Sequence, residues 1–284
     1  MACQSTKRRV LILANPDKPG APDALASLCS FVRDRAELTD ASCSLDVSRA
    51  VSERPDRIIV LGGDGTLIGV ARAMGEAQSP LIGVNMGKLG FLAEFSLESL
   101  CHELDAALGD DRLISRRMML DVTLELRGGR DVKSTAVNDC VIQMGPPFRM
   151  ITLSITIDGE HLTRIRGDGL AVCTPTGSTA HSLSAGGPVM SPELRAIGLT
   201  PFNPHSLTHR PVVFGPDVVL EIRPEAVNSG SSVIIDGQVT HPLTNGDIIR
   251  VRRAKPEFHL VRHPRSSPWH NLVNKLHWGQ TPAE

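Results

Sequence analysis

The sequence predicts an N-terminal α/β domain with a parallel sheet, followed by a β-rich, sandwich-like domain. The first part of the chain alternates short apolar runs with amphipathic helical patterns, which is typical of parallel sheets covered on both faces. From residue 116 onward, short β-rich runs separated by turn residues replace that alternation. The length of 284 residues suits two modest domains better than one large one.

The predicted first domain covers residues 1–115. Strands are predicted at 8–14, 57–61 and 80–84, and helices at 22–38, 66–75 and 94–114. The first apolar run leads directly into a loop, so we interpret it as a strand and not as a signal peptide. Gly-rich loops follow the second and third strands, at the C-terminal ends of the strands, where parallel sheets bind ligands.

The predicted second domain covers residues 116–254. Its β-rich runs lie at 118–126, 133–143, 151–157, 170–174, 212–214, 218–222, 232–236 and 248–251. The tail 255–284 is predicted to return to the first domain and complete it. We expect a short docking helix there, with apolar positions at Trp269, Leu272, Val273, Leu276 and Trp278.

Composition narrows the function classes. Hydrophobic residues make up 41% and charged residues 21%, and the formal net charge is −1, so no basic surface for nucleic acid or an anionic membrane is expected. Aromatic residues are 3% and tyrosine is absent, which leaves few stacking platforms for single-stranded nucleic acid. The six cysteines lie scattered with no C-x-x-C pair, and no segment has the apolar length of a membrane span. We therefore expect reduced thiols and a soluble, cytoplasmic protein.

The sharpest local motif is Gly62-Gly63-Asp64-Gly65-Thr66, directly after the predicted strand 57–61. Three glycines permit a close backbone approach to a ligand, and the start of the next helix offers free N–H groups to a phosphate. The motif is not a Walker A loop, because no Gly-Lys-Ser/Thr follows. The alternative is a tight strand-to-helix turn in which Asp64 caps the helix.

A carboxylate beside phosphates needs a chemical role. Asp64 could hold a Mg²⁺ ion, or it could accept the proton of an attacking hydroxyl during phosphoryl transfer. A sugar hydroxyl is a poor nucleophile, so a positioned base accelerates its reaction roughly 10²–10⁴-fold. Asp64 is therefore the first candidate for the base.

The second Gly loop, at residues 85–92, follows its strand as the first loop does, so the two loops should lie side by side. Lys88 in this loop could supply a point charge for a phosphate. Its alternative is an ordinary surface lysine in a turn.

Three further features lie in the second domain. Residues 167–169 and 174–188 are dense in hydroxyls and glycines, which suits either a linker or a binding loop. The apolar run 170–173 beside them and two prolines favour a rigid binding loop. Asn138-Asp139 interrupts an apolar run, and such a pair could read an adenine edge and hold ribose hydroxyls. Asp236-Gly237-Gln238 is either a simple hairpin turn or part of the site.

Together these motifs resemble the NAD kinase family over most of the chain. The matching segments are Asn15-Pro16 with Lys18, GGDGT at 62–66, NMGKLGFLAEF at 85–95, Asn138-Asp139, the long motif at 167–192, PHSLTHRPVV at 204–213 and Asp236-Gly237-Gln238. The first Gly motif alone is shared with diacylglycerol and sphingoid-base kinases. The motif at 167–192 is far more restrictive and carries the resemblance.

The resemblance implies two domains with an active site in the cleft between them, ATP with Mg²⁺ as donor (or inorganic polyphosphate), NAD as substrate, and a homodimer or homotetramer. It implies that Asp64 activates the adenosine 2′-hydroxyl of NAD, and that Asn138 and Asp139 contact that adenosine. Asp168 matches an aspartate that contacts NAD. The full set of candidate binding residues is Gly62, Gly63, Gly65, Thr66, Lys88, Phe91, Asn138, Asp139, Arg166, Asp168, Ser178, Thr179, Ala180, His181, Ser184 and Gln238.

One position departs from the family pattern: His181 stands where members usually carry tyrosine. An imidazole brings less apolar area and a titratable charge, so we expect a weaker or pH-dependent hold on NAD. Two rival functions remain. A lipid or sphingoid-base kinase would need an apolar groove, which the polar motif at 167–192 does not offer. A non-catalytic NAD(H) sensor would keep the fold and the ligand without transfer, and the presence of Asp64 gives that alternative no support.

Overall fold

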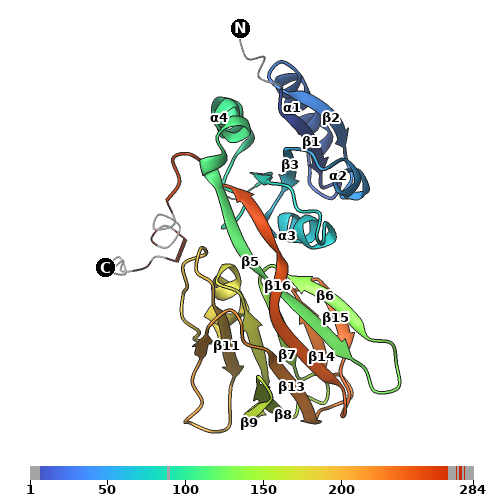
Figure 1. Ribbon diagram of the computed structural model, residues 1–284, viewed down its shortest axis with the longest axis vertical. Helices are drawn as coiled ribbons and strands as arrows, with labels where there is room; N and C mark the ends of the chain where they lie inside the picture. The colour runs from blue at the N-terminus through green and yellow to red at the C-terminus, as the bar shows by residue number, and fades with distance from the viewer. Residues whose placement is uncertain (1–6, 88–89, 268–272, 274, 277, 279–284) are drawn as a thin grey trace. The chain divides into compact units, whose positions relative to one another are not determined.

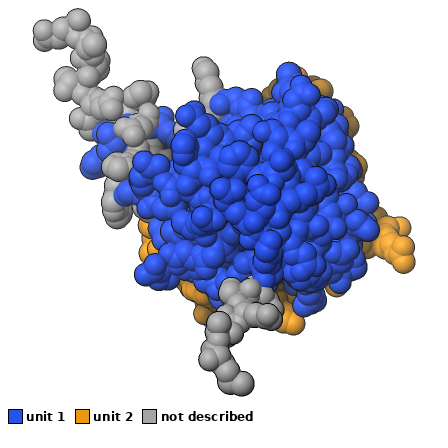
Figure 2. Space-filling model, turned by 90° about the horizontal axis from the view of Figure 1, so that it is seen from above, with its two compact units in different colours: residues 1–116, 258–284 blue, residues 117–257 orange. Residues whose placement is uncertain are grey.

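The computed structural model describes residues 7–87, 90–267, 273, 275, 276 and 278 (Figure 1). The chain divides into two compact units, which Figure 2 shows in different colours. Unit 1 comprises residues 1–116 and 258–284, and unit 2 comprises residues 117–257.

Unit 1 is built on a parallel sheet. Its strands are β1 (Arg9–Ala14), β2 (Glu37–Ser42), β3 (Arg57–Gly62) and β4 (Leu81–Asn85), in the order β2-β1-β3-β4. Its helices are α1 (Ala21–Arg33), α2 (Ser48–Glu53), α3 (Asp64–Ala73), α4 (Leu97–Gly109) and the short 3₁₀ helix η1 (Asp111–Leu113). β3 is buried along its whole length and β1 along nearly all of it, which explains why their sequences are unbroken apolar runs.

Two helices of unit 1 share a core with this sheet. Leu28 and Val32 of α1 are fully buried in one cluster with Leu100 and Leu104 of α4. α4 begins at a capping box, in which Ser96 Oγ accepts from the Ser99 N–H at 3.0 Å and Ser99 Oγ accepts from the Ser96 N–H at 2.9 Å. The donors at this helix end are thus partly satisfied by the chain itself.

Several predicted elements of this unit were wrong in extent. The predicted helix 22–38 ends at Arg33, and residues 37–42 form the edge strand β2 instead. The predicted helix 94–114 starts only at Leu97, because Phe95 forms an isolated bridge with Val84 and its carbonyl accepts from Asn85. The helix α2 was not predicted at all.

Unit 2 is built from antiparallel strands. They are β5 (Ile114–Glu125, which starts in unit 1), β6 (Val132–Ala136), β7 (Asp139–Gln143), β8 (Ile151–Ile157), β9 (Glu160–Gly167), β10 (Gly169–Cys173), β11 (Ile197–Phe202), β12 (Val212–Phe214), β13 (Leu220–Ala226), β14 (Ser232–Ile235), β15 (Val239–Pro242) and β16 (Ile248–Val261, which ends in unit 1). One sheet has the order β12-β11-β10-β7-β14-β15. The other strands pair as β9 with β8, β8 with β13, β13 with β16, and β5 with β6 and β16. Both sets contribute to one apolar core, so the sandwich-like prediction is confirmed.

The strand prediction for unit 2 needs three corrections. The predicted run 133–143 is two strands, because Val137 and Asn138 leave the ladder between β6 and β7. β9, β11 and β15 were missed. The run 248–251 is only the start of β16, which continues to Val261 and there pairs in parallel with β4 through Leu260 and Leu81.

The predicted tail helix is only partly open to inspection. Trp269 and Leu272 lie outside the described residues. Residues 273, 275 and 276 are helical and Leu276 is half-buried, whereas Val273 is 38% and Trp278 65% exposed. Lys275 contacts unit 1 through the ring of Phe91. Among the helices that the structure describes, none combines the length and apolar character needed to cross a membrane.

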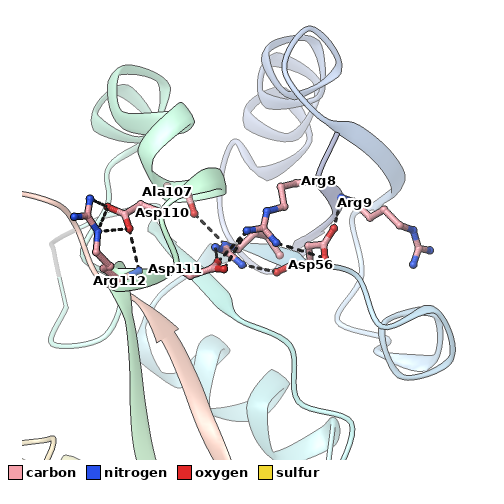
Figure 3. A network of polar contacts seen from close by, with 8 residues as sticks. Arg8, Arg9, Asp56, Ala107, Asp110, Asp111 and Arg112 are labelled. Atoms are coloured by element: carbon pink, nitrogen blue, oxygen red, sulfur yellow. Dashed lines mark hydrogen bonds and ion pairs between the residues drawn. The ribbon is translucent and has the colours of Figure 1, made fainter. Parts of the chain in front are cut away.

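A buried arginine, Arg57, joins β3 to the end of α4, and Figure 3 labels three of its neighbours, Asp56, Ala107 and Asp111. Arg57 is 2% exposed, and its guanidinium donates to the carbonyls of Ala107 (3.1 Å) and Asp56 (2.9 Å) and to the Asp111 carboxylate (2.5 Å). Arg8 donates to the same carboxylate at 3.1 Å. The hydrogen bond from Arg57 holds the pKa of the Asp111 carboxyl below its ordinary value.

We expect Asp111→Asn to lower the free energy of unfolding by about 1–2 kcal/mol at pH 7. A hydrogen bond to a charged group contributes roughly 1.5–3 kcal/mol, and the figure is reduced here because the Asp111 side chain is 61% exposed. The depressed pKa means that this stabilisation is complete above about pH 4 and is lost as the pH falls through the folded value. Denaturant titrations at pH 7, 5 and 3 would measure it.

Asp105→Asn is the matched control, because that carboxylate is 87% exposed and faces Arg35 at 3.5 Å. Its effect should stay within about 0.5 kcal/mol. A difference between wild type and Asp111→Asn that is as large at pH 3 as at pH 7 would contradict the assignment.

Candidate active site

The carboxylate of Asp64 joins the two Gly loops of unit 1. Gly63 is the N-cap of α3, and Asp64, the first residue of the helix, does not cap it. Instead Asp64 Oδ2 accepts from the Phe91 N–H at 2.6 Å, and Oδ1 accepts from the N–H groups of Leu92 (3.0 Å) and Ala93 (2.9 Å). The alternative of Asp64 as a helix cap is therefore wrong.

Gly90 is required by this arrangement. A Cβ atom added at Gly90 would lie 1.9 Å from Asp64 Oδ1, far inside van der Waals contact. The glycine thus allows the second loop to close around the carboxylate. Because three amides fix its orientation, Asp64 cannot rotate away from this loop without losing three hydrogen bonds.

The first Gly loop, at residues 62–66, is also held by Asn15. Asn15, which follows β1, donates from Nδ2 to Thr66 Oγ1 at 3.0 Å, and its N–H donates to the Leu61 carbonyl at 2.9 Å. A Cβ at Gly62 would lie 2.6 Å from the Thr66 side chain, whereas one at Gly63 would meet nothing within 4 Å. Gly62 is therefore needed for packing, and Gly63 leaves open space beside the start of α3.

The two loops lie side by side, as expected, because β3 and β4 pair in parallel with Gly62 opposite Asn85. Gly65 is exposed, Thr66 is buried and Phe91 is half-buried. Lys88 lies outside the described residues, so its expected phosphate contact stays a prediction.

A second aspartate holds three consecutive amides in unit 2. Asp236 Oδ1 accepts from the N–H groups of Asn138 (2.7 Å) and Asp139 (3.1 Å), and Oδ2 accepts from the Val137 N–H (3.0 Å). Burial raises the pKa of the Asp236 carboxyl, although the three N–H donors lower it. Residues 236–238 connect β14 to β15, and the first two of them, Asp236 and Gly237, have positive φ angles of 51° and 67°, as the tight turns of hairpins require. The turn therefore also positions Asn138 and Asp139.

The loop at 174–188 approaches Asn138 from its other side. Thr174 Oγ1 donates to the Val137 carbonyl at 2.7 Å and accepts from the Gly177 N–H at 3.0 Å, and the Thr174 N–H donates to the Asn138 carbonyl at 2.8 Å. A Cβ at Gly177 would lie 2.0 Å from the Asn138 carbonyl oxygen. These contacts hold the loop against Val137 and Asn138, and the loop contains the short helices η2 (Thr176–Thr179) and α5 (His181–Ser184).

His181 is paired with Asp139. Its Nδ1 lies 3.0 Å from Asp139 Oδ2; the Asp139 side chain is 1% exposed and that of His181 is 49% exposed. The hydrogen bond that the ring makes to the Asp139 carboxylate raises the pKa of His181 above its ordinary value, against a smaller opposing effect of burial. A Cβ added at Gly237 would lie 3.9 Å from His181 Cε1, so the ring also faces the hairpin turn that carries Gln238.

The other candidate residues of unit 2 divide into two groups. Ser178 and Thr179 lie in η2, Ser184 lies in α5 with His181, and Ala180 lies between the two helices. Ser178 is fully buried and its Oγ donates to the Pro175 carbonyl, whereas Ser184 is exposed.

Arg166 and Asp168 lie at the opposite end of β10. Gly169 pairs with Gln143 there, whereas Cys173 at the other end pairs with Asp139, about 13 Å away along the strand. Asp168 Oδ2 accepts from Asn203 Nδ2 at 2.8 Å, and Arg166 is exposed. Within one chain these two residues are not brought together with Asp139 and His181.

The described cysteines, at 29, 43, 101, 140 and 173, are free. Burial raises the pKa of the Cys140 thiol, which lies beside Asp139 and Asp236, and raises that of Cys173 to about 11. Neither is therefore an activated nucleophile.

Comparison with known proteins identifies the family. The model of the ATP-NAD kinase N-terminal domain matches residues 27–112, and that of the ATP-NAD kinase C-terminal domain matches residues 137–263. The NAD kinase of Geotalea daltonii is 43% identical over 241 residues, which cover 84% of each chain. The NAD kinase of Geobacter metallireducens is 38% identical over 282 residues, covering 96% of this chain and 99% of the relative. The chain belongs to the NAD kinase family.

Solved structures of NAD kinases and related enzymes share its fold. A yeast NADH kinase in complex with NADH superposes with a TM-score of 0.84 at 25% identity, over 98% of this chain and 89% of its own. An NAD kinase from Archaeoglobus fulgidus in complex with ATP gives 0.76 at 25% identity, over 95% and 98%. NAD kinases are phosphotransferases, so the lipid-kinase and sensor alternatives are not favoured.

Sequence reasoning missed four residues that shape the site of this NAD kinase family member. Gly90 and Gly177 could be recognised as loop glycines, but the sequence did not show that Asp64 and Asn138 pack too closely against them to leave room for a Cβ atom. Thr174 was one hydroxyl among many in the loop, and Lys275 gave no signal, because an isolated lysine near a chain end is ordinary.

Proposed function

We propose that this protein transfers the terminal phosphate of ATP to the adenosine 2′-hydroxyl of NAD, with Asp64 as the general base. The observation that supports this role is the state of the Asp64 carboxylate. A carboxylate has about four lone-pair positions, and the amides of residues 91–93 occupy three of them. One position on Oδ2 is left to accept a proton from a substrate.

The chemistry needs one proton transfer at this atom. As the 2′-oxygen forms its bond to the terminal phosphorus, the bond to the ADP oxygen breaks and the hydroxyl proton passes to Asp64. The open space at Gly63 and the N-terminus of α3 give the donor phosphates a place beside the base. The backbone N–H groups of α3 and the fixed Asp64 carboxylate thus position the donor phosphates and the attacking hydroxyl, and phosphoryl transfer depends mainly on such positioning.

We assign NAD binding to unit 2. Asn138 and Asp139 are held by Asp236 from one side and by the loop 174–177 from the other, which makes them a rigid platform for the adenosine. His181 and the short helices around it continue that platform.

Four further proposals concern the metal ion, the cellular location, the oligomeric state and an alternative phosphate donor. The described residues include no group of three His, Cys, Asp or Glu side chains that could hold a metal, so we propose that Mg²⁺ enters with the phosphates of ATP. From the scattered cysteines and the family resemblance we also propose a cytoplasmic homodimer or homotetramer, with polyphosphate as an alternative donor.

We expect the KM for NAD of the wild-type protein to be about two- to fivefold lower at pH 6 than at pH 8. The pKa of His181 is raised by Asp139, so the charged pair is present below about pH 6.5 and is lost as the pH rises through the folded value. The imidazolium would both hold the ring on Asp139 and attract the pyrophosphate of NAD. Steady-state kinetics at the two pH values would measure this.

His181→Tyr is the control, since a tyrosine hydroxyl donates a hydrogen bond without titrating in this range. Its ratio of KM values should be close to one. If wild type and variant have the same pH profile, His181 is not responsible.

The proposed function is tested by incubating the pure protein with NAD, ATP and Mg²⁺ and measuring NADP with a strictly NADP-dependent dehydrogenase. NADP formation is expected. If none forms, polyphosphate and NADH are tested next. Failure with all of them, while calorimetry still detects NAD binding, would overturn the kinase in favour of a sensor.

A further inference from the structure

A pocket opens in unit 1 beside the Asp64 carboxylate. Its volume is about 290 Å³, and it is lined by Gly90, Glu94, Ser96, His263, Arg265 and Lys275, among others. Gly90 is the residue whose Cα packs against Asp64, so this pocket shares a wall with the proposed base. Gly90 and Glu94 belong to the motif at 85–95, whereas His263, Arg265 and Lys275 lie in the last part of the chain, outside the family motifs.

Lys275 places a cation on this wall. Its Nζ lies 4.9 Å from the centroid of the Phe91 ring, and the Phe91 N–H is the one that donates to Asp64 Oδ2. Burial lowers the pKa of Lys275, while the negative charges of Asp64 and Glu94 raise it. Within the described part of the chain, no carboxylate lies at ion-pair distance from this ammonium, so its donors remain available to a ligand.

Polar and charged side chains also line the rest of the pocket, among them Glu94, His263 and Arg265. The His263 N–H donates to Glu94 Oε2 at 2.9 Å, and the Arg265 N–H donates to His263 Nδ1 at 3.2 Å, which puts the proton of a neutral His263 ring on Nε2. Arg265 pairs with Glu103 at 2.6 Å and remains 73% exposed. Glu94 therefore has one of its oxygens engaged, and the cations are Lys275 and Arg265.

The volume of about 290 Å³ and the two cations fit a short phosphate chain. Pockets for whole organic ligands occupy about 300–1,000 Å³, so this pocket lies at the lower limit of that range and suits a group smaller than a dinucleotide. An ammonium is a compact point charge that suits phosphate oxygens. The described residues offer no three-ligand metal cluster as an alternative occupant.

We propose that Lys275 is a donor-binding residue, whose ammonium holds the phosphate chain of the phosphoryl donor in this pocket, next to Asp64. The proposal rests on the proposed function, since it places the donor beside the base. It also gives the C-terminal tail a function in the reaction: the tail brings a cation to the Gly loops that neither GGDGT nor the described part of the second loop contains.

The test compares Lys275→Met, Lys275→Arg and the control Lys255→Met, which removes the same charge from an exposed position of β16. For Lys275→Met we expect the KM for ATP to rise about tenfold or more, with the KM for NAD changed less than about twofold. Lys275→Arg should recover most of the loss. Thermal unfolding of all three variants should match the wild type.

Tripolyphosphate is the binding probe, measured by calorimetry on the same proteins. Its affinity should fall in Lys275→Met by a factor similar to that for ATP. An unchanged KM for ATP and unchanged tripolyphosphate affinity would overturn the proposal. So would Met and Arg variants that are equally impaired, because that result indicates a packing role.

The two proposals fail separately. If the wild type makes NADP and Lys275→Met binds ATP normally, the pocket assignment is wrong and the kinase stands. If the wild type makes no NADP but binds tripolyphosphate, and Lys275→Met weakens that binding, the pocket stands and the kinase is wrong.

Discussion

Asp64→Asn is expected to lower kcat by about 10²–10⁴-fold, with a much smaller change in the KM for NAD. The range is that of a positioned general base. Asp64 is the carboxylate of the GGDGT loop, so its replacement leaves this loop without a group that can receive the proton of the substrate hydroxyl. A loss confined to kcat would identify an interaction made in the transition state. Steady-state kinetics with the coupled NADP assay measures both constants.

The geometry complicates this substitution. An asparagine retains one oxygen for the amides of Leu92 and Ala93, but its NH₂ group would then face the Phe91 N–H, where the carboxylate now accepts at 2.6 Å. Two donors in contact repel, so the second loop is also disturbed. Thermal unfolding and NAD binding by calorimetry must therefore accompany the kinetics.

Asp236→Asn is the matched control, because that carboxylate also holds three consecutive amides, at residues 137–139. If broken amide contacts alone explained the loss, both variants should behave alike. We expect instead that Asp236→Asn mainly raises the KM for NAD and lowers stability. An Asp64→Asn protein that retains more than about a tenth of wild-type kcat would exclude Asp64 as the base.

The part of the fold that could be predicted is the part where burial fixes the sequence. β3 is buried on both faces, so every position is apolar or glycine apart from Arg57, and the run is unmistakable. β2 has the sequence ELTDAS and is at most half-buried, because it pairs only with β1 at the edge of the sheet. Polar residues suit a strand whose outer edge faces solvent. Their sequence shows no alternation of apolar and polar positions, so it could not be distinguished from the end of the preceding helix.

The site could be predicted only in outline for a related reason. The glycines and Asp64 mark a phosphate loop locally, but the partners of Asp64 lie 27 to 29 residues further along the chain. Those of Asp236 lie 97 to 99 residues earlier. A carboxylate that binds three consecutive amides leaves no pattern in its own neighbourhood, because the amides belong to whatever residues the fold brings there.

His181 is a second case in which the sequence gives the residue but not its partner. The sequence indicated a titratable ring in place of a tyrosine, and the structure supplies the partner, the buried carboxylate of Asp139. Only with that partner does the direction of the pKa change follow, since burial alone would lower the pKa of a histidine. The pH dependence proposed above rests on that contact.

Gly177→Ala is expected to lower the free energy of unfolding by about 3 kcal/mol or more and to weaken NAD binding at least about tenfold. The added Cβ would lie 2.0 Å from the Asn138 carbonyl oxygen and 2.5 Å from its Cα, so backbone and not a side chain must move. Asn138 cannot yield easily, because Asp236 holds its N–H and Thr174 its carbonyl. Calorimetry with NAD and denaturant titration measure the two effects.

Gly215→Ala is the control, since its Cβ would meet nothing within 4 Å and its effect should stay within about 0.5 kcal/mol. Should Gly177→Ala fail to fold, Thr174→Val addresses the same contact more gently. It removes the hydroxyl that donates to the Val137 carbonyl and accepts from the Gly177 N–H, with an expected cost of about 1–3 kcal/mol. A Thr174→Val protein that binds NAD as tightly as wild type would show that the loop does not set the position of Asn138 for the ligand.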